Sequence, residues 1–170
     1  QDDLAHASHS NAARAWAEGR LDRQVMTAHL PNGNTLKDDN LVRKQSEREG
    51  YSKLKPVFDR ETGSVTAGNS SPLTDGAGAL LMMSEKKAAA LGYTPLGYIR
   101  SYAFAARTPQ DDLLMGPVLA APAAMARAGL ALSDLTLVDM HEAFAGQVAC
   151  NLRGLADDDY VRSQTGLAAL

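Results

Sequence analysis

The sequence has 170 residues, of which 45% are hydrophobic and 22% charged, so its composition fits a folded chain with a core and argues against disorder. A formal net charge of −3 disfavours general binding to nucleic acid or to anionic membranes. The single cysteine, Cys150, excludes an internal disulfide and a cysteine-based zinc site, and it fits a reducing compartment such as the cytoplasm.

The first third of the chain predicts short helices separated by polar loops. Residues 2–18 are rich in alanine and predict a helix that Gly19 closes. Residues 29–40 are polar and rich in turn formers, and they predict a loop. The Ser46–Glu49 pair has the spacing of a capping box, which predicts a short helix toward Leu54.

The rest of the chain predicts buried strands that alternate with helices. The predicted strands are residues 79–83, 96–106 and 135–140, and the predicted helices are residues 84–91, 117–128 and 142–155. This alternation indicates an α/β fold with a layered sheet. Cys150 lies within the last of these helices, among apolar residues, and is expected to be buried and structural.

The most suggestive polar residues are His141 and Glu142, followed by Ala143 and Phe144, at the junction between a predicted strand and a predicted helix. Ligands of α/β folds bind at the carboxyl ends of strands, and the first turn of a helix offers free N–H groups. A histidine there is able to donate a hydrogen bond to a developing oxyanion. The alternative is that His141 and Glu142 only start the helix while Phe144 joins the core.

Two further stretches allow more than one interpretation. Asn69, Ser70 and Ser71 lie in the glycine-rich stretch 63–78, where they would either bind the amides of a thioester's pantetheine arm or stabilise turns, the second being favoured. The basic run 43–55 predicts a solvated helix face or a site for a small polyanion.

Several common motifs do not occur. The sequence has no Gly-x-x-x-x-Gly-Lys-Ser/Thr loop, no Gly-x-Gly-x-x-Gly after a strand and no His-Glu-x-x-His, which disfavours kinases, dehydrogenases and zinc hydrolases. His6 and His9 share one helix face, but no third ligand accompanies them, so no metal site is expected.

Five stretches in order resemble the thiolase family. They are KLKPVF at 53–58, SVTAGNSSPLTDGAGALLMMSE at 64–85, GPVLAAP at 116–122, RAGL at 127–130 and DLTLVDMHEAFAGQ at 134–147, and the opening QDDLAHASHSNAARAWAEGRLDRQV also looks like a thiolase helix. The His-Glu-Ala-Phe and Asn-Ser-Ser patterns, with the acidic stretch 157–161, are most similar to the 3-ketoacyl-CoA thiolase β-subunit of the fatty-acid oxidation trifunctional complex.

The resemblance implies an incomplete thiolase fold of layered α-β-α-β-α type. Residues 1–72 would be the later part of the loop domain, residues 73–95 the end of the N-terminal half, and residues 96–170 the start of the C-terminal half.

The resemblance also implies roles for individual residues. His141 would help form the oxyanion hole, and Phe144 would line the pocket beside the acyl group. Ser71 would hydrogen-bond the pantetheine arm of coenzyme A. The other expected coenzyme A contacts are Ala67 and Gly68, which would allow close approach of the arm, and Arg43, Leu54 and Phe58, which would lie near the nucleotide end.

The implied reaction is transfer of an acyl group from a 3-ketoacyl thioester to coenzyme A, with release of acetyl-CoA, in fatty-acid β-oxidation. Coenzyme A and acyl-CoA would be substrates, with no permanently bound cofactor. This chain contains neither the Gly-His-Pro histidine nor the Cys-x-Gly-Gly cysteine of thiolases, and the family's nucleophilic cysteine lies upstream of these motifs, so the chain is expected to be a central fragment without activity of its own.

The implied partners are the remainder of a thiolase chain, a second copy in a homodimer or tetramer, and a hydratase/dehydrogenase α-subunit; no nucleic acid is expected. Two alternatives stay open. One is a non-catalytic module from a split or degenerate thiolase that binds acyl-CoA or a partner, and the other is a biosynthetic acetoacetyl-CoA thiolase, which His141 in place of asparagine disfavours.

Overall fold

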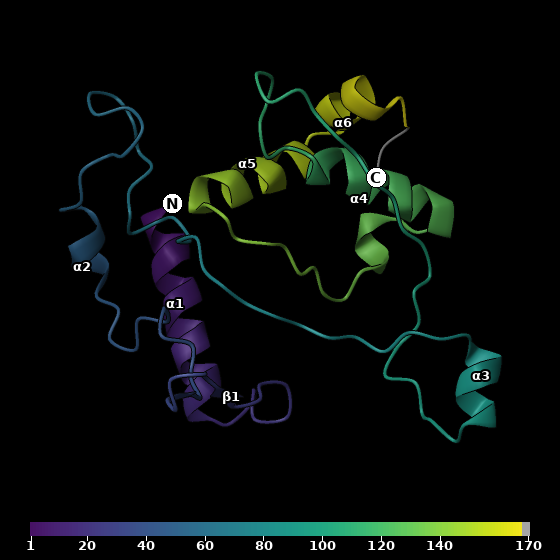
Figure 1. The fold of residues 1–170 in the computed structure, drawn as a ribbon. Helices are drawn as coiled ribbons and strands as arrows, with labels where there is room; N and C mark the ends of the chain where they lie inside the picture. The colour runs from purple at the N-terminus through teal and green to yellow at the C-terminus, as the bar shows by residue number, and fades with distance from the viewer. Residues whose placement is uncertain (168–170) are drawn as a thin grey trace. The chain divides into compact units, whose positions relative to one another are not determined.

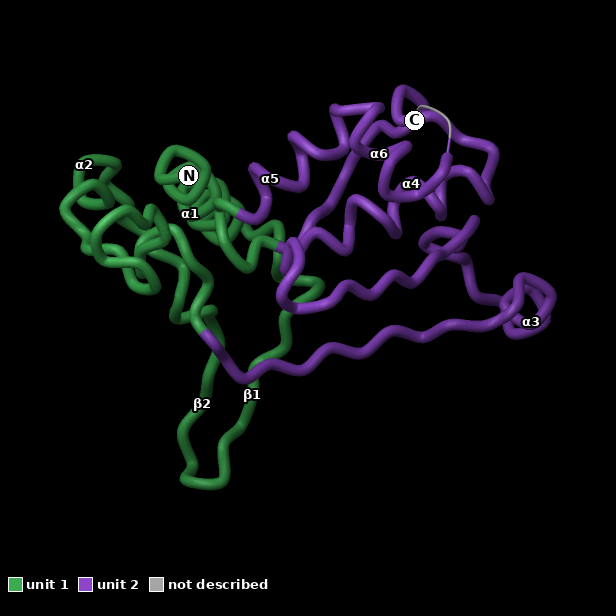
Figure 2. Tube along the Cα trace, turned by 90° about the horizontal axis from the view of Figure 1, so that it is seen from above, with its two compact units in different colours: residues 1–72, 142–146 green, residues 73–141, 147–170 purple. Residues whose placement is uncertain are grey.

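The computed structural model describes residues 1–167 (Figure 1), and their chain divides into two compact units (Figure 2). Unit 1 consists of residues 1–72 and 142–146, and unit 2 consists of residues 73–141 and 147 onward. No helix among the described residues is both long and apolar enough to cross a membrane.

Unit 1 is built on the helix α1 (Asp2–Ala17), which confirms the first predicted helix. Alanine-rich sequence favours the helical backbone, and the two aspartates in the first turn complement the helix dipole. The short helix α2 (Arg48–Tyr51) packs against α1, and its Tyr51 forms a small core with Ala5 and Ala145. The first residue of the later helix α5, Ala145, therefore belongs to the core of unit 1.

A small hairpin corrects the prediction of a loop at residues 29–40. Strands β1 (Ala28–His29) and β2 (Thr35–Leu36) pair antiparallel, with Ala28 opposite Leu36 (Figure 2). Gly33 has a φ of +84° in the connecting turn, a conformation that glycine adopts without steric cost. Two-residue strands are too short to produce an alternating hydrophobic pattern, which is why the sequence suggested only a loop.

Unit 2 contains the helices α3 (Glu85–Ala90), α4 (Pro117–Ala128), most of α5 (Ala145–Leu155) and α6 (Asp158–Thr165), with a short 3-10 turn, η1 (Leu132–Asp134). The prediction for α4 is confirmed at both ends, because Pro117 starts the helix and Gly129 ends it with a φ of +66°. Helix α4 packs against α6, and Val118 on α4 and Val161 on α6 are both completely buried. Burying a side chain of this size stabilises the unit by about 1.5–3 kcal/mol.

The three predicted strands are not strands within the described residues. Residues 79–83, 96–106 and 135–140 run as non-helical chain without strand pairing. The first two are part of the long runs on either side of α3 in Figure 1, and the third lies between η1 and α5. Leu80 and Leu81 remain 79% and 74% exposed. A strand requires a neighbouring strand for its backbone hydrogen bonds, and the described residues supply none for these segments.

Two smaller expectations also change. Cys150 is exposed on α5, which corrects the prediction that it is buried. The capping-box prediction is wrong as well, because Glu47 rather than Ser46 precedes α2 and makes no side-chain cap. The hydroxyl of Ser46 contacts His6 and Tyr51 instead.

Candidate functional site

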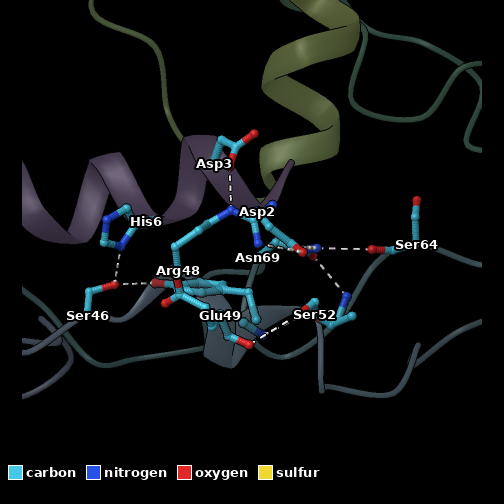
Figure 3. Close-up of polar contacts among 12 residues, drawn as sticks. Asp2, Asp3, His6, Ser46, Arg48, Glu49, Ser52, Ser64 and Asn69 are labelled. Atoms are coloured by element: carbon cyan, nitrogen blue, oxygen red, sulfur yellow. Dashed lines mark hydrogen bonds and ion pairs between the residues drawn. The ribbon is translucent and has the colours of Figure 1, made fainter.

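The glycine-rich stretch of unit 1 is organised around the side chain of Asn69, which is 3% exposed (Figure 3). Its Nδ2 donates to Oδ1 of Asp2 at 2.8 Å and to the carbonyl of Ser64 at 3.0 Å, while its Oδ1 accepts the backbone N–H of Thr66 at 2.9 Å. A buried amide with these partners fixes both its own loop and the start of α1. For Asn69, the turn-stabilising interpretation is confirmed.

The same stretch is joined by backbone hydrogen bonds to the residues that start α5. The N–H of Ser71 donates to the carbonyl of Ala143 at 2.9 Å, and the N–H of Ala145 donates to the carbonyl of Asn69 at 2.9 Å. One of the N–H groups that a helix start leaves without an intrahelical partner is thereby satisfied. Ser71 and the 143–145 segment are consequently held side by side, and Ser71 itself is exposed.

The rings of Phe58 and Phe144 also meet in this unit. Their centroids lie 6.3 Å apart in an edge-to-face arrangement, a favourable geometry for aromatic pairs. A backbone bridge between Ser70 and Phe144 positions the second ring, and a bridge between Pro56 and Thr66 lies two residues before Phe58. Phe58 nevertheless remains 77% exposed, so its side of the pair is open to solvent.

Gly68 brings the stretch close to α2 and the residues after it. A Cβ at this position would lie 2.6 Å from Cδ1 of Leu54 and 3.0 Å from Cδ1 of Tyr51, so only glycine fits without displacing them. The adjacent carbonyl of Ala67 accepts Nη2 of Arg43 at 3.3 Å. These contacts gather four of the residues expected to form a ligand site.

Arg43 is held by aromatic and imidazole groups. Its guanidinium lies 5.7 Å from the centroid of the Tyr51 ring, a cation–π arrangement, and its backbone N–H donates to Nδ1 of His9 at 3.2 Å. Next to it, Ser46 Oγ lies 3.0 Å from Nδ1 of His6 and 2.7 Å from the Tyr51 hydroxyl. The segment that carries Arg43 is thus attached to one face of α1.

Arg48, at the start of α2, is paired with Asp2 and Asp3 at the start of α1 (Figure 3). The guanidinium of Arg48 hydrogen-bonds Asp3 and lies 3.7 Å from Oδ2 of Asp2. The hydrogen bond from Arg48 and its positive charge hold the pKa of Asp3 below its ordinary value. Arg48 is in turn stabilised in its charged form, because the same hydrogen bond raises its pKa.

Seven of the eight predicted site residues lie in unit 1, and His141 is the exception. It is exposed and belongs to unit 2, directly before Glu142, which belongs to unit 1. The carboxylate of Glu142 accepts the hydroxyl of Ser8, so the residue that follows His141 is attached to α1.

The sequence did not predict the residues that position Arg43 and the segment around it. They are His6, His9, Ser46 and Tyr51, whose contacts with Arg43 and with one another are given above. The spacing of His6 and His9 at i and i+3 places both on one helix face and was the only sequence pattern pointing to them.

Comparison with known proteins gives consistent matches over nearly the whole chain. Residues 1–86 match the family model described as "Thiolase, N-terminal domain", and residues 93–168 match "Thiolase, C-terminal domain". A 3-ketoacyl-CoA thiolase of Pectobacterium atrosepticum is 59% identical over 98% of this chain but only 38% of its own length. The chain therefore spans about 38% of the length of this curated relative.

Solved structures show the same relationship. Human mitochondrial 3-ketoacyl-CoA thiolase in complex with CoA superposes with a TM-score of 0.82 at 34% identity, covering 99% of this chain and 41% of that one. The acetyl-CoA acetyltransferase of Bacillus anthracis gives a TM-score of 0.85 at 32% identity, covering 98% of this chain and 42% of that one. These matches confirm the predicted fold class, part of a thiolase fold. The chain belongs to the thiolase family.

Proposed function

We propose that this chain is a section of a 3-ketoacyl-CoA thiolase, an acetyl-CoA acyltransferase of fatty-acid β-oxidation, and that unit 1 contributes a coenzyme A-binding surface. The observation that carries the proposal is the contact of Arg43 with Ala67 and of Gly68 with Leu54, which brings residues from separate parts of the sequence to one place. The 59% identity to a 3-ketoacyl-CoA thiolase supports the same assignment.

The chemistry of this surface suits the two ends of coenzyme A. The guanidinium of Arg43 is a suitable donor for phosphate oxygens, and a planar adenine ring would pack on the exposed faces of Phe58 and Leu54. Ala67 and Gly68 have little or no side chain, so a pantetheine arm is able to approach their backbone, with the exposed hydroxyl of Ser71 as a hydrogen-bond partner.

His141 is assigned the oxyanion role in this proposal. A thioester carbonyl develops negative charge when a nucleophile attacks it, and a histidine N–H stabilises that charge directly or through water. Phe144, immediately after the 142–143 segment, would supply the apolar wall beside the acyl group. The exposed position of His141 leaves its ring accessible to such a substrate.

The isolated chain is proposed to be inactive. Acyl transfer through a covalent thioester needs a cysteine thiolate and groups that move protons to and from the two thiols. The single cysteine, Cys150, lies mid-helix on α5 and is not followed by the Cys-x-Gly-Gly pattern.

We further propose that the exposed apolar segments 79–83 and 96–106 pair with other parts of a complete thiolase in a dimer or tetramer, with a hydratase/dehydrogenase α-subunit as an additional partner. A cytoplasmic location is part of the proposal, supported by the single unpaired cysteine within the described residues.

The test of the binding surface is a calorimetric titration of the chain with coenzyme A. Arg43→Gln is expected to weaken binding about tenfold, because it removes a charge-assisted hydrogen bond to phosphate. Arg60→Gln is the matched control, since Arg60 is an exposed arginine of the same unit outside the contacts described above. Equal loss in both variants, or no binding by the unaltered chain, would contradict the proposal.

The test of the chemistry has two parts. The isolated chain should transfer no acetyl group from acetoacetyl-CoA, and turnover that survives Cys150→Ala would contradict its assignment as an inactive section. In a thiolase that includes this sequence, His141→Ala should lower kcat strongly with little change in coenzyme A affinity; the reverse pattern would refute the oxyanion role.

A non-catalytic acyl-CoA-binding module is the second candidate, favoured by the exposed mid-helix position of the one cysteine. The gene distinguishes the two. A cysteine codon upstream and Gly-His-Pro codons downstream in the same frame would support the enzyme, and a stop codon directly after residue 170 would support the module.

A further inference from the structure

Two histidines of α1 attach the segment that carries Arg43, and both do so through Nδ1. Nδ1 of His9 accepts the backbone N–H of Arg43 at 3.2 Å. One turn earlier, Nδ1 of His6 lies 3.0 Å from Oγ of Ser46. Their i, i+3 spacing places the two rings on one face of the helix, so the segment from Arg43 to Ser46 lies along that face.

The contact at His9 has a definite protonation requirement. A backbone N–H only donates, so the ring nitrogen that receives it must carry a lone pair. A doubly protonated imidazolium has no such lone pair and would also place a second positive charge beside Arg43. The hydrogen bond therefore exists only while the His9 ring is neutral.

The surroundings of His9 favour the neutral ring. Partial burial and the neighbouring charge of Arg43 lower the pKa of His9, while Asp39 and Glu142, the acidic groups that face it, act in the opposite direction more weakly. Since a lowered pKa means that the folded chain prefers the neutral form, the stabilising contribution is complete above the ordinary pKa of 6.5 and is lost as the pH falls through the lowered value.

Both the main chain and the side chain of Arg43 are held by hydrogen bonds or ring contacts. Its main chain is held by His9, and its guanidinium is held by the carbonyl of Ala67 at 3.3 Å and by the ring of Tyr51. A guanidinium has five N–H donors, so a contact with one carbonyl still leaves a directed cation for a bound anion. An arginine ordered in advance loses less conformational entropy when it binds a phosphate.

We infer that His9 is a positioning residue for coenzyme A binding: its neutral imidazole holds the main chain of Arg43 so that the guanidinium is ordered toward the phosphates of the substrate. Protonation of His9 in mild acid releases this segment and weakens the binding of coenzyme A. The inference rests on the proposed coenzyme A contact of Arg43 and adds a residue and a pH dependence to it.

The test compares two substitutions of His9 that differ in hydrogen-bonding capacity. His9→Asn keeps a side-chain oxygen acceptor near the position of Nδ1, and this amide does not titrate. His9→Leu removes the acceptor at similar size. His29→Leu is the control, because His29 is an exposed histidine on β1, outside these contacts.

At a pH of about 7.5, where histidine is mostly neutral, coenzyme A is expected to bind the unaltered chain and His9→Asn similarly, and His9→Leu about fivefold more weakly, the effect of one hydrogen bond. As the pH is lowered in steps from about 7.5 through the lowered pKa of His9, the unaltered chain should lose affinity relative to His9→Asn. This comparison removes the contribution of the phosphate group of coenzyme A, which also titrates near pH 6.

Equal affinities of His9→Leu and the unaltered chain at a pH of about 7.5, or no loss of affinity of the unaltered chain relative to His9→Asn in acid, would overturn the inference while leaving the proposed function intact. If the unaltered chain does not bind coenzyme A, the proposed function fails, and amide exchange at Arg43 decides whether the attachment exists. Exchange that is slow in the unaltered chain and in His9→Asn but fast in His9→Leu supports the attachment, and equal exchange in all three overturns it.

Discussion

The two units of this chain obtain their order in different ways. In unit 1, polar side chains and single backbone hydrogen bonds join segments that are far apart in the sequence, such as Asp2 with Asn69 and Ser8 with Glu142. In unit 2, order is concentrated in helices that bury apolar residues, such as Val118 on α4 and Val161 on α6, while long apolar segments stay exposed.

The two units differ because a helix forms from local sequence alone, whereas a strand needs a partner from elsewhere in the chain. A helix satisfies its own backbone hydrogen bonds, so it forms wherever its sequence and its ends allow. A segment such as 79–83 has the composition of a buried strand but can become one only when another strand is present. Unit 1 avoids this dependence because its isolated bridges, Pro56 with Thr66 and Ser70 with Phe144, lie within the unit itself.

The largest effect is expected at the centre of unit 1. Asn69→Ala should destabilise the unit by about 3 kcal/mol, because it removes a buried side chain with three hydrogen bonds and leaves the N–H of Thr66 without its acceptor. Hydrogen exchange at the amides of Ser71 and Ala145 measures the loss. Asn11→Ala, an exposed asparagine on α1, is the control and should change protection little; similar losses in both would show that long-range polar contacts do not order unit 1.

In unit 2 the corresponding substitution is Val118→Ala. Removing two methyl groups from a completely buried side chain should cost about 2 kcal/mol and reduce the amide protection of α4 and α6. Val138→Ala provides the control, because Val138 is 53% exposed. If α4 kept its protection, local apolar packing would not be the source of order in this unit.

The exposed segments should control self-association. Leu81→Lys places a charge on a segment whose apolar side chains are exposed. It is expected to raise the concentration at which the chain associates by about tenfold. Sedimentation velocity over a concentration series measures this. Leu36→Lys, at a 48% exposed leucine of the hairpin, should have a smaller effect; an equal one would mean that exposure alone, rather than the unpaired segment, drives association.

The smallest effect concerns the ion pair at the start of α1. Arg48 lowers the pKa of Asp3, so the ion pair between them favours the folded state. This stabilisation is complete above the ordinary Asp pKa of 3.8 and is lost as the pH falls through the lowered pKa. Arg48→Gln should return the pKa of Asp3 toward 3.8, measured by an NMR titration of the carboxyl carbon. Arg20→Gln, which removes another exposed ion pair, is the control and should leave the pKa of Asp3 unchanged.

Sequence patterns predicted the helices well where the end residues are diagnostic. Pro117 and Gly129 delimit α4, and Ser84 caps α3 by accepting the N–H of Lys87 at 3.3 Å. The helix α6 was missed, although Asp157 at its start and Gly166 at its end form the same kind of pattern. Its strongly polar composition concealed its single buried position, Val161.

The candidate site was predictable only through family resemblance, because its contacts are long-range. Nothing in the local sequence links Arg43 to Ala67 or Phe58 to Phe144. The predicted strands failed for a related reason, since their existence depends on partners that no local pattern contains. The histidines that hold Arg43 required the three-dimensional arrangement of α1 and the 43–46 segment.

The hydrogen bonds that join residues 69–71 to residues 143–145 also have a consequence for synthesis of the chain. A ribosome releases residues in order, so α1, α2 and the glycine-rich stretch emerge long before the segment that completes their unit. Helix α4 needs no such delay, because its hydrogen bonds lie within twelve consecutive residues. Unit 1 should therefore close late during translation, after most of unit 2 has emerged, and slow folding with a high contact order is expected for it.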